Sequence, residues 1–213
     1  NCLLNVMECF PTADIKVFVD SITEETWEWL HTLPRITIQK IHAGSDAKSM
    51  RVLLEEAVTI EDDNQIILFQ EDDYLYLPGS ESKIIEALQY AHYATGYLHP
   101  DKFMHPSRGG NPYTPADNVS EATQVIKTNS HFWMVTNSTT NTFATTVGTI
   151  KEDIDVWMWG TDDGINTKDF AIFLKLREKG RALVQPLPSL ATHCLKGLEA
   201  PTVGLPINSW EEI

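Results

Sequence analysis

Three consecutive carboxylates, Glu71, Asp72 and Asp73, follow the apolar residues 66–69 and precede a second run rich in tyrosine and leucine at residues 74–77. A short apolar run bounded by polar residues is typical of a buried strand. In open α/β folds ligands bind outside the carboxyl ends of the strands, so this strand would carry the carboxylates to a ligand-binding edge. Adjacent carboxylates raise one another's pKa unless a cation lies between them. The triplet is therefore either a cation site or a solvated acidic turn.

A hard divalent cation would relieve the repulsion within the triplet. When one or two carboxylates hold such an ion, its remaining coordination positions are open to a diphosphate. Neighbouring residues of a strand point to opposite faces, so the three carboxylates do not all reach one ion in good geometry. We therefore expect Asp73 to be the direct ligand, and Glu71 and Asp72 to orient a nucleotide ribose and the water molecules of the ion.

The elements that would position the triplet alternate between strands and helices. Apolar residues recur with a period of two in the predicted strands and with helical spacing in the predicted helices. The strands are predicted at residues 14–20, 36–42, 65–69, 125–135, 142–150 and 181–185. The helices are predicted at residues 3–10, 47–58, 82–97 and 168–179. This alternation predicts an α/β domain with a mainly parallel, mixed central sheet flanked by helices.

The segment at residues 99–117 is rich in proline and glycine, which are unfavourable in regular structure. A loop of roughly twenty residues inside a compact domain is usually a lid or a binding loop. Lys102 and Arg108 lie in this loop and are candidates to bind a diphosphate or an anionic acceptor. A plain surface charge is the alternative for each of them.

The composition excludes several classes of protein. A chain of 213 residues, of which 42% are hydrophobic, can bury one substantial core, so we expect a single domain over residues 1–213. The formal net charge of −14 disfavours binding to nucleic acid. No apolar run approaches the roughly 18 residues of a membrane span, and no signal peptide is visible. Cys2, Cys9 and Cys194 suggest neither a zinc site nor a disulfide framework, so we expect a reducing, cytoplasmic location.

Several segments, taken in their order along the chain, resemble those of the GT-A fold glycosyltransferases, which have a Rossmann-like domain. They are residues 44–51, 67–79, 99–102, 138–143 and 189–193. Within that family the chain is similar to the amino-terminal domains of chlorella-virus glycosyltransferases that act on the capsid protein. The resemblance implies a nucleotide-sugar-binding half at about residues 1–100 and an acceptor-binding half at about residues 101–213. It also implies further domains of the same polypeptide as partners, and the host-cell cytoplasm as the location of a viral protein.

The resemblance implies transfer of a sugar from a UDP-sugar, of the glucose or rhamnose type, to a glycan or glycoprotein acceptor such as a viral capsid glycan. The implied cofactor is Mn²⁺ or Mg²⁺, which would neutralise the charge that builds on the leaving diphosphate. Asp73 matches the last acidic residue of the family's DXD metal motif. His193 matches the late histidine that completes the metal site, and a neutral imidazole suits Mn²⁺. A structural histidine is the alternative.

The nucleotide site of the family falls on three further residues. Asp20 ends a predicted strand at the place where the family contacts the base, and a cap on the helix beginning near Thr23 is the alternative. Ser49 and Arg51 lie on the helix that faces the nucleotide. Arg51 could pair with a phosphate through its planar fork, or it could be an ordinary exposed arginine. Members of the family begin with a strand that holds the base, so either this strand lies outside the sequence or residues 2–7 form it.

The acceptor half of the family falls on acidic and aromatic residues. Asp162 and Asp163 lie in a polar turn before a predicted helix, where either could bind acceptor hydroxyls or act as a general base. Capping of the helix is the alternative. Aromatic rings that could form a platform for the faces of an acceptor sugar, or could instead belong to the core, are Tyr113, Trp133, Trp157 and Trp159.

Two other functions compete with a transferase. A sugar-phosphate nucleotidyltransferase would need a glycine-rich phosphate loop with a basic residue, and the sequence shows none. A non-catalytic carbohydrate-binding domain would keep the same fold without turnover. Metal-dependent hydrolysis of a UDP-sugar that disappears in Asp73→Ala would distinguish the enzyme from the binding domain.

Overall fold

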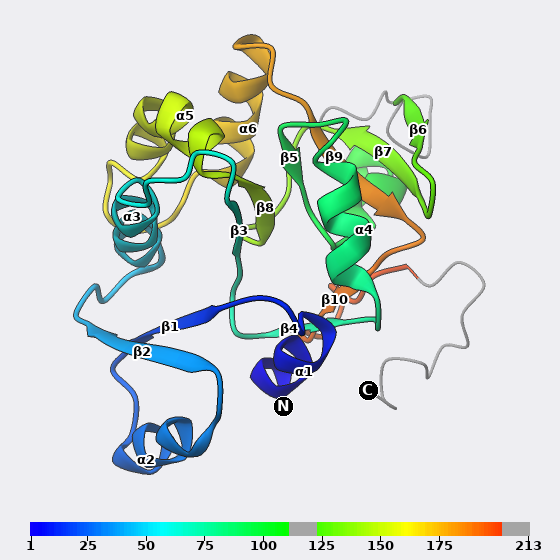
Figure 1. Ribbon diagram of the computed structural model, residues 1–213. Helices are drawn as coiled ribbons and strands as arrows, with labels where there is room; N and C mark the ends of the chain where they lie inside the picture. The colour runs from blue at the N-terminus through cyan, green and yellow to red at the C-terminus, as the bar shows by residue number, and fades with distance from the viewer. Residues whose placement is uncertain (111–122, 202–213) are drawn as a thin grey trace.

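The computed structural model describes residues 1–110 and 123–201 (Figure 1). The helices in this part are α1 (Cys2–Cys9), α2 (Glu24–Thr32), α3 (Asp46–Ala57), α4 (Ser80–Ala87), α5 (Val147–Gly160) and α6 (Asp169–Glu178), with the short 3-10 helices η1 (Pro100–Phe103) and η2 (Pro106–Arg108). The strands are β1 (Ile15–Asp20), β2 (Ile36–Ile41), β3 (Ile66–Phe69), β4 (Tyr74–Tyr76), β5 (Tyr93–Ala94), β6 (Val125–Lys127), β7 (Phe132–Thr136), β8 (Phe143–Thr146), β9 (Leu183–Leu187) and β10 (Ala191–His193).

Three of the helices begin at a hydroxyl side chain that caps them. Thr23 accepts a hydrogen bond from Thr26 N at 3.2 Å, and Thr146 accepts one from Thr149 N at 3.2 Å. Ser45 accepts one from Lys48 N at 3.4 Å and so fixes the first residue of α3. Each cap satisfies a backbone N–H that has no partner inside its helix, which is why these starts can be located from sequence.

The central sheet has six strands in the order β3-β8-β5-β9-β7-β6. Only β5 and β9 run parallel, and the other four neighbouring pairs are antiparallel. Two smaller sheets accompany it: β1 and β2 are parallel, and β4 and β10 are antiparallel. The expected α/β class with a mixed sheet is confirmed, but the expectation of a mainly parallel sheet is wrong for the six-stranded sheet.

The difference between the expected parallel sheet and the observed, mainly antiparallel sheet has two local causes. The helix expected at residues 82–97 ends at Ala87, and the chain then forms β5 in the middle of the sheet. The strand expected at residues 142–150 ends at Thr146, where the cap starts α5. β8 therefore runs antiparallel to both of its neighbours, β3 and β5. Apolar runs of this length do not by themselves separate a buried helix from a buried strand.

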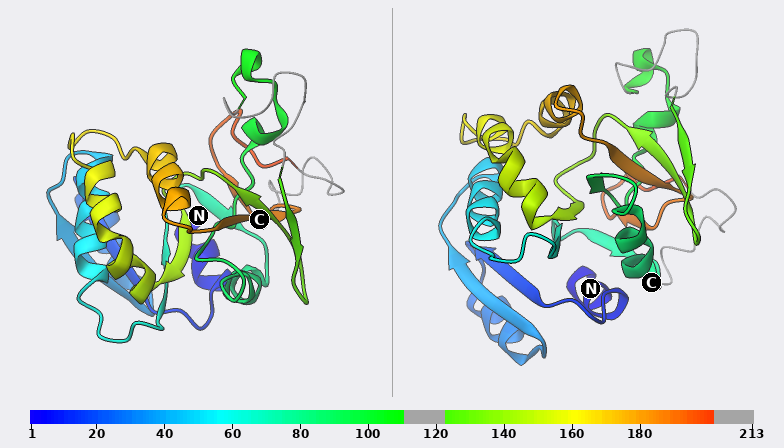
Figure 2. Two further views of the ribbon diagram at one scale, coloured as in Figure 1. Left: turned by 90° about the horizontal axis from the view of Figure 1, so that it is seen from above. Right: turned by 45° about the horizontal axis from the view of Figure 1, so that its top comes forward.

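The six-stranded sheet is covered on both faces. Tyr93, Phe143 and Leu183 pack with residues of α3, α5 and α6 in one core cluster. The next residue of each strand, Ala94, Ala144 and Val184, packs on the opposite side with residues of α1 and α4. This follows from the alternation of side chains along a strand. Figure 2 shows α3, α5 and α6 gathered on one side and α4 on the other.

Within the described residues, no helix combines the length and the apolar character that crossing a membrane requires.

Candidate functional site

Asp73 and His193 meet where the short β4–β10 ladder ends. His193 is the register partner of Tyr74, the residue after Asp73. The imidazole Nε2 of His193 lies 2.7 Å from Oδ2 of Asp73, although the two residues are 120 positions apart. The ring of His193 stacks on that of Tyr74, with centroids 4.7 Å apart and an interplanar angle of 10°. The ladder and the stacking therefore fix the orientation of both side chains.

The second polar atom of each side chain has no partner among the residues that the structure describes. Oδ1 of Asp73 and Nδ1 of His193 are buried and form no hydrogen bond within the described part of the chain. That part also holds no cluster of three or more His, Cys, Asp or Glu side chains arranged for a metal ion. Two protein ligands suit Mn²⁺ or Mg²⁺ in sites where a substrate diphosphate and water complete the coordination. A carboxylate oxygen and an imidazole nitrogen are both donors that Mn²⁺ accepts, so the facing atoms Oδ2 of Asp73 and Nε2 of His193 fit the expected cation by their chemistry.

Glu71 begins the link between the triplet and the central sheet. Its backbone N–H donates to Oγ1 of Thr142 at 3.3 Å, and its Oε1 accepts from Nδ2 of Asn141 at 3.4 Å. The pKa of Glu71 is raised to about 7, chiefly by burial and to a smaller extent by the charges of Asp73 and Asp46, while the hydrogen bond from Asn141 lowers it. Glu71 can thus exchange a proton near neutral pH. Asp72, between the two, is exposed.

Asp46, the first residue of α3, is tied to the same site. Its Oδ1 accepts from Nδ2 of Asn141 at 3.0 Å, and its Oδ2 accepts from Thr167 N at 2.7 Å. Asn141 therefore bridges the carboxylates of Asp46 and Glu71. Several buried polar atoms here or nearby lack a partner among the described residues: Gln70 Oε1, Thr139 Oγ1, Asn141 Oδ1 and Thr167 Oγ1. Unpaired buried polar atoms are costly, and a ligand rich in hydroxyl groups would satisfy them.

Asp169, the first residue of α6, adds a fourth carboxylate close to Asp46. Burial raises the pKa of Asp169 to about 6, and the charge of Asp46 acts in the same direction. The charges of His99 and Lys102 partly offset this rise. Lys102 itself is buried and donates to Ser138 Oγ at 2.6 Å and to Asn137 Oδ1 at 3.3 Å. The positive charge of Lys102 therefore lies within reach of the acidic cluster.

The residues expected at the nucleotide have other contacts. Asp20 accepts hydrogen bonds from the backbone N–H groups of Ala43 and Gly44, chiefly the latter, which lower its pKa. It thus joins the end of β1 to the loop before α3, while α2 is capped by Thr23. Arg51 donates to the carbonyl oxygen of Met158 at 2.9 Å. Ser49 is half-buried on α3.

The two carboxylates expected to be catalytic are exposed in the turn between α5 and α6. Asp162 pairs with Lys168 at 2.6 Å. Asp163 accepts from the backbone N–H groups of Ile165 and Asn166, which lower its pKa. Within residues 1–110 and 123–201, no hydrogen bond or ion pair joins either carboxylate to Asp73. The turn nonetheless lies beside the start of α3, because Ser45 Oγ donates to the carbonyl oxygen of Gly164.

Of the four aromatic residues considered for an acceptor platform, two belong to the core, which was the alternative for each of them. Trp133 and Trp157 are almost completely buried, because each lies on the face of its strand or helix that packs into one of the two core clusters. Trp159 is 37% exposed, with the ammonium of Lys175 4.1 Å from its ring centroid. Tyr113 lies outside the described residues. Arg108 is exposed on η2.

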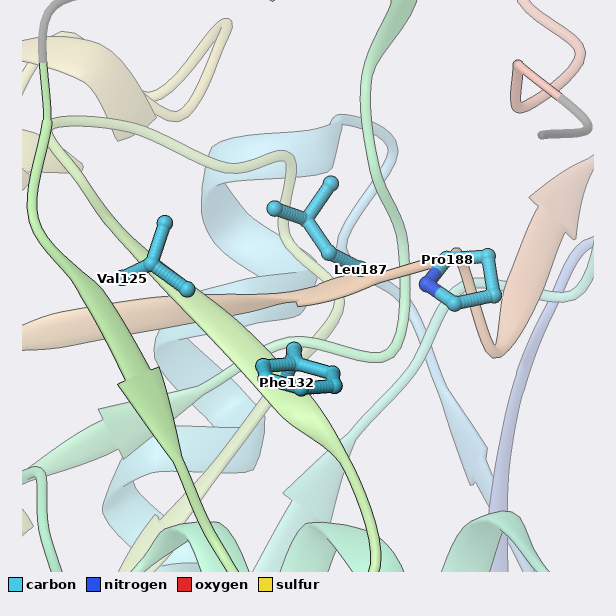
Figure 3. A pocket seen from close by; sticks show the side chains of 4 residues that line it. All are labelled: Val125, Phe132, Leu187 and Pro188. Atoms are coloured by element: carbon cyan, nitrogen blue, oxygen red, sulfur yellow. The ribbon is translucent and has the colours of Figure 1, made fainter.

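A shallow apolar pocket of about 280 Å³ lies away from the carboxylates, on the surface formed by β6, β7 and the end of β9 (Figure 3). Its lining residues are Val125, Phe132, Leu187 and Pro188. It offers almost no polar surface, so it does not suit a nucleotide or a metal ion.

Reasoning from sequence missed four polar residues of the site: Asp46, Asn141, Thr167 and Asp169. Asp46 and Asn141 lie within segments that resemble the family, and Asp169 directly follows the start expected for its helix. A carboxylate at the first turn of a helix is ordinarily explained by the helix dipole, so it carries no functional signal on its own.

Comparison of the chain with models of protein families and with curated proteins found no match.

Proposed function

We propose that this protein is a metal-dependent glycosyltransferase that moves a sugar from a UDP-sugar, of the glucose or rhamnose type, to a glycan or glycoprotein acceptor. The observation that carries the proposal is the contact between Oδ2 of Asp73 and Nε2 of His193, which brings the two expected metal ligands together across 120 positions of the chain. The proposed cofactor is Mn²⁺ or Mg²⁺. The resemblance to GT-A enzymes supports this assignment and makes a viral capsid glycan an acceptor to test.

In the proposed reaction, Asp73 and His193 hold the cation at the end of the β4–β10 ladder. The bound cation would act as a Lewis acid and stabilise the charge on the leaving diphosphate. Glu71 is oriented by Asn141 and would bind hydroxyl groups of the nucleotide or the sugar. Asp72 is exposed beside it and is proposed to contact the ribose. Lys102 supplies a buried positive charge toward the diphosphate.

Asp169 is the proposed proton acceptor for the acceptor hydroxyl. A general base works best when its pKa is near the operating pH, and burial raises the pKa of Asp169 to about 6. Asp162 and Asp163 are less suited, because Asp162 is engaged by Lys168 and two backbone N–H groups lower the pKa of Asp163. Their proposed role is to contact the acceptor.

The mixed sheet with helices on both faces is compatible with a GT-A domain, which we include in the proposal as the finer fold assignment. Asp20, Ser49 and Arg51 would lie toward the nucleotide in that fold. Asp20 would act by shaping the loop before α3. Arg51 donates to Met158 here and would contact a phosphate through its remaining N–H groups.

The test is calorimetric titration of UDP-, GDP- and dTDP-sugars into the protein with and without Mn²⁺, followed by an assay for sugar transfer and hydrolysis. We expect one UDP-sugar to bind only with metal and to be hydrolysed slowly in the absence of acceptor. Metal-dependent binding without any turnover would indicate the carbohydrate-binding domain instead. Absence of binding to every sugar nucleotide by folded protein would refute both.

The variant Asp73→Asn should lower the affinity for Mn²⁺ and for the donor at least tenfold, because the amide has no charge to offer the cation. Asp62→Asn, in the exposed turn before β3, removes the same charge outside the site and serves as the matched control. Circular dichroism of both variants checks folding. If Asp73→Asn kept metal-dependent donor binding at the level of Asp62→Asn, the metal assignment would be wrong.

A further inference from the structure

Two cysteines from opposite ends of the described chain lie side by side. Sγ of Cys2, at the start of α1, is 3.8 Å from Sγ of Cys194, the residue after β10. Cys194 is exposed and Cys2 is half-buried, so reagents in solution reach this pair. The third cysteine, Cys9, is buried and donates to the carbonyl oxygen of Tyr76.

Both cysteines are held in place through the same strand. α1 is attached to β4 by Asn5, whose side chain donates to Tyr76 O at 3.0 Å and accepts from Tyr76 N at 2.6 Å. Cys194 is attached to the start of β4, because its backbone N–H donates to the carbonyl oxygen of Asp73 at 2.8 Å. The proximity of the two sulfur atoms is therefore a consequence of two independent sets of hydrogen bonds, one from the Asn5 side chain and one from the Cys194 backbone.

We propose that Cys2 and Cys194 are a redox-active pair that forms a reversible disulfide. A disulfide bond needs the sulfur atoms about 2 Å apart, so the two side chains must approach by a little under 2 Å. This site does not depend on the proposed glycosyltransferase function. Its two members are 192 positions apart, so the sequence pattern alone gave no sign of pairing.

The co-reactant is a low-molecular-weight disulfide such as oxidised glutathione. Cys194, the more exposed member, attacks one sulfur of that disulfide after losing its proton and releases one glutathione thiolate. Desolvation and the neighbouring Cys2 raise the pKa of Cys194 to about 11, so this first step is slow at neutral pH. Cys2, after losing its proton, attacks the Cys194 sulfur of the mixed disulfide and releases the second glutathione thiolate. The two protein thiols are oxidised, the small disulfide is reduced to two thiols, and the two cysteine protons end on the glutathione sulfurs. A reducing compartment would keep the pair as thiols, so the disulfide would form only when the surroundings become oxidising.

The bond would act on the neighbouring site and on stability. Cys194 directly follows His193, and its backbone is bonded to Asp73, so the bridge would tie α1 to the end of the β4–β10 ladder. A cross-link between such distant positions restricts the unfolded chain strongly. We expect oxidation to raise Tm by roughly 5–10 °C for a chain of this size.

The experiment incubates the native protein in buffers of defined ratio of reduced to oxidised glutathione, alkylates the remaining thiols and maps peptides by mass spectrometry without reduction. The expected products are a linked Cys2–Cys194 peptide and a loss of two titratable thiols. Cys9→Ser should behave in the same way, whereas Cys2→Ser and Cys194→Ser should give no linked peptide and no rise in Tm. Circular dichroism of each reduced variant checks that it is folded.

Two outcomes would overturn the proposal. One is glutathione retained on Cys194 with no linked peptide, which would show that Cys2 does not reach it. The other is a disulfide between two chains, seen as a dimer on non-reducing gels that persists in Cys2→Ser. Either result leaves the glycosyltransferase proposal unaffected, because donor binding is measured under reducing conditions.

Discussion

At the scale of single residues, the burial of carboxylates decides the chemistry of the site. Glu71 and Asp169 both have pKa values raised by burial, to about 7 and about 6, while backbone N–H groups lower the pKa of the exposed Asp163. All three are acidic residues in polar stretches of sequence. Only their surroundings distinguish a group that exchanges protons near neutral pH from one that stays charged.

Asp169 should make the stability of the protein depend on pH. Its folded pKa of about 6 lies above the ordinary value of 3.8, so its stabilising contribution is full below pH 3.8 and disappears as the pH rises through 6. Asp169→Asn keeps the acceptor for Phe170 N but cannot ionise. Between pH 4 and pH 7, the free energy of unfolding of the native protein should therefore fall relative to that of Asp169→Asn, by at most about 3 kcal/mol. Urea denaturation across this range measures it.

Asp163→Asn is a control for which the expected change of stability with pH has the opposite sign. The pKa of Asp163 is lowered, so its contribution is present above the ordinary value of 3.8 and is lost as the pH falls through the folded value. The native protein should gain stability over Asp163→Asn as the pH rises from 3 to 5. The same trend for both variants would contradict the assigned burial of Asp169.

At the scale of secondary-structure elements, the close approach of α5 and α6 sets the turn that carries Asp162 and Asp163. Gly160 ends α5, and a Cβ atom there would lie 2.1 Å from Cγ1 of Ile172 on α6. Ile172 is completely buried, so its side chain has no room to move. The start of α6 is also bonded to the end of α5, through Lys168 N and the carbonyl oxygen of Gly160 at 2.9 Å.

The substitution Gly160→Ala should lower the free energy of unfolding by about 1–3 kcal/mol, because it forces the two helices apart. Gly148→Ala, in the first turn of the same helix, is the matched control. Its Cβ would lie 3.2 Å from both Cβ and the backbone carbonyl oxygen of Asp63, a contact that a shift of a few tenths of an ångström relieves. Chemical denaturation of both variants gives the comparison. An equal effect of the two substitutions would show that helix packing at Gly160 is not responsible.

At the scale of the whole molecule, a buried ionic network joins helix α5 to the central sheet. Asp153 on α5 is completely buried and accepts hydrogen bonds from Tyr93 Oη on β5 at 2.9 Å and from Arg181 Nε at 2.8 Å. Lys179 Nζ lies 3.1 Å from its other oxygen. Trp157 donates to the same Tyr93 hydroxyl. One carboxylate thus connects α5, the sheet and the segment after α6.

Replacing this carboxylate should be strongly destabilising. Asp153→Ala leaves the guanidinium of Arg181 and the hydroxyl of Tyr93 without their buried partner, which costs about 3–5 kcal/mol. Glu152 is the other partner of Arg181, and its side chain is 68% exposed. Glu152→Gln should therefore cost less than about 1 kcal/mol. Thermal and urea denaturation of the two variants test the difference. Similar losses for both would mean that burial of Asp153 does not govern the network.

The sequence by itself determined the features that depend on a few neighbouring residues. These are the α/β class, the start of α3 at the hydroxyl cap Ser45, the start of a helix near Thr23, and the position of the acidic triplet after β3. Caps and side-chain periodicity are local, so they can be found from a short stretch of chain. The same locality explains the failures at β5 and β8, where a short apolar run fits either a strand or a helix.

Only the tertiary structure decided which distant groups meet. The resemblance implied one metal site for Asp73 and His193, and the structure supplies their contact across 120 positions. The bridge from Asp46 through Asn141 to Glu71, which joins the first turn of α3 to the loops flanking β3 and β8, was not expected from sequence. The direction of β8 and the burial of Trp133 and Trp157 depend equally on strand pairing. The pKa values of Glu71 and Asp169 follow from this packing, because desolvation is a property of the assembled surroundings and not of the residue type.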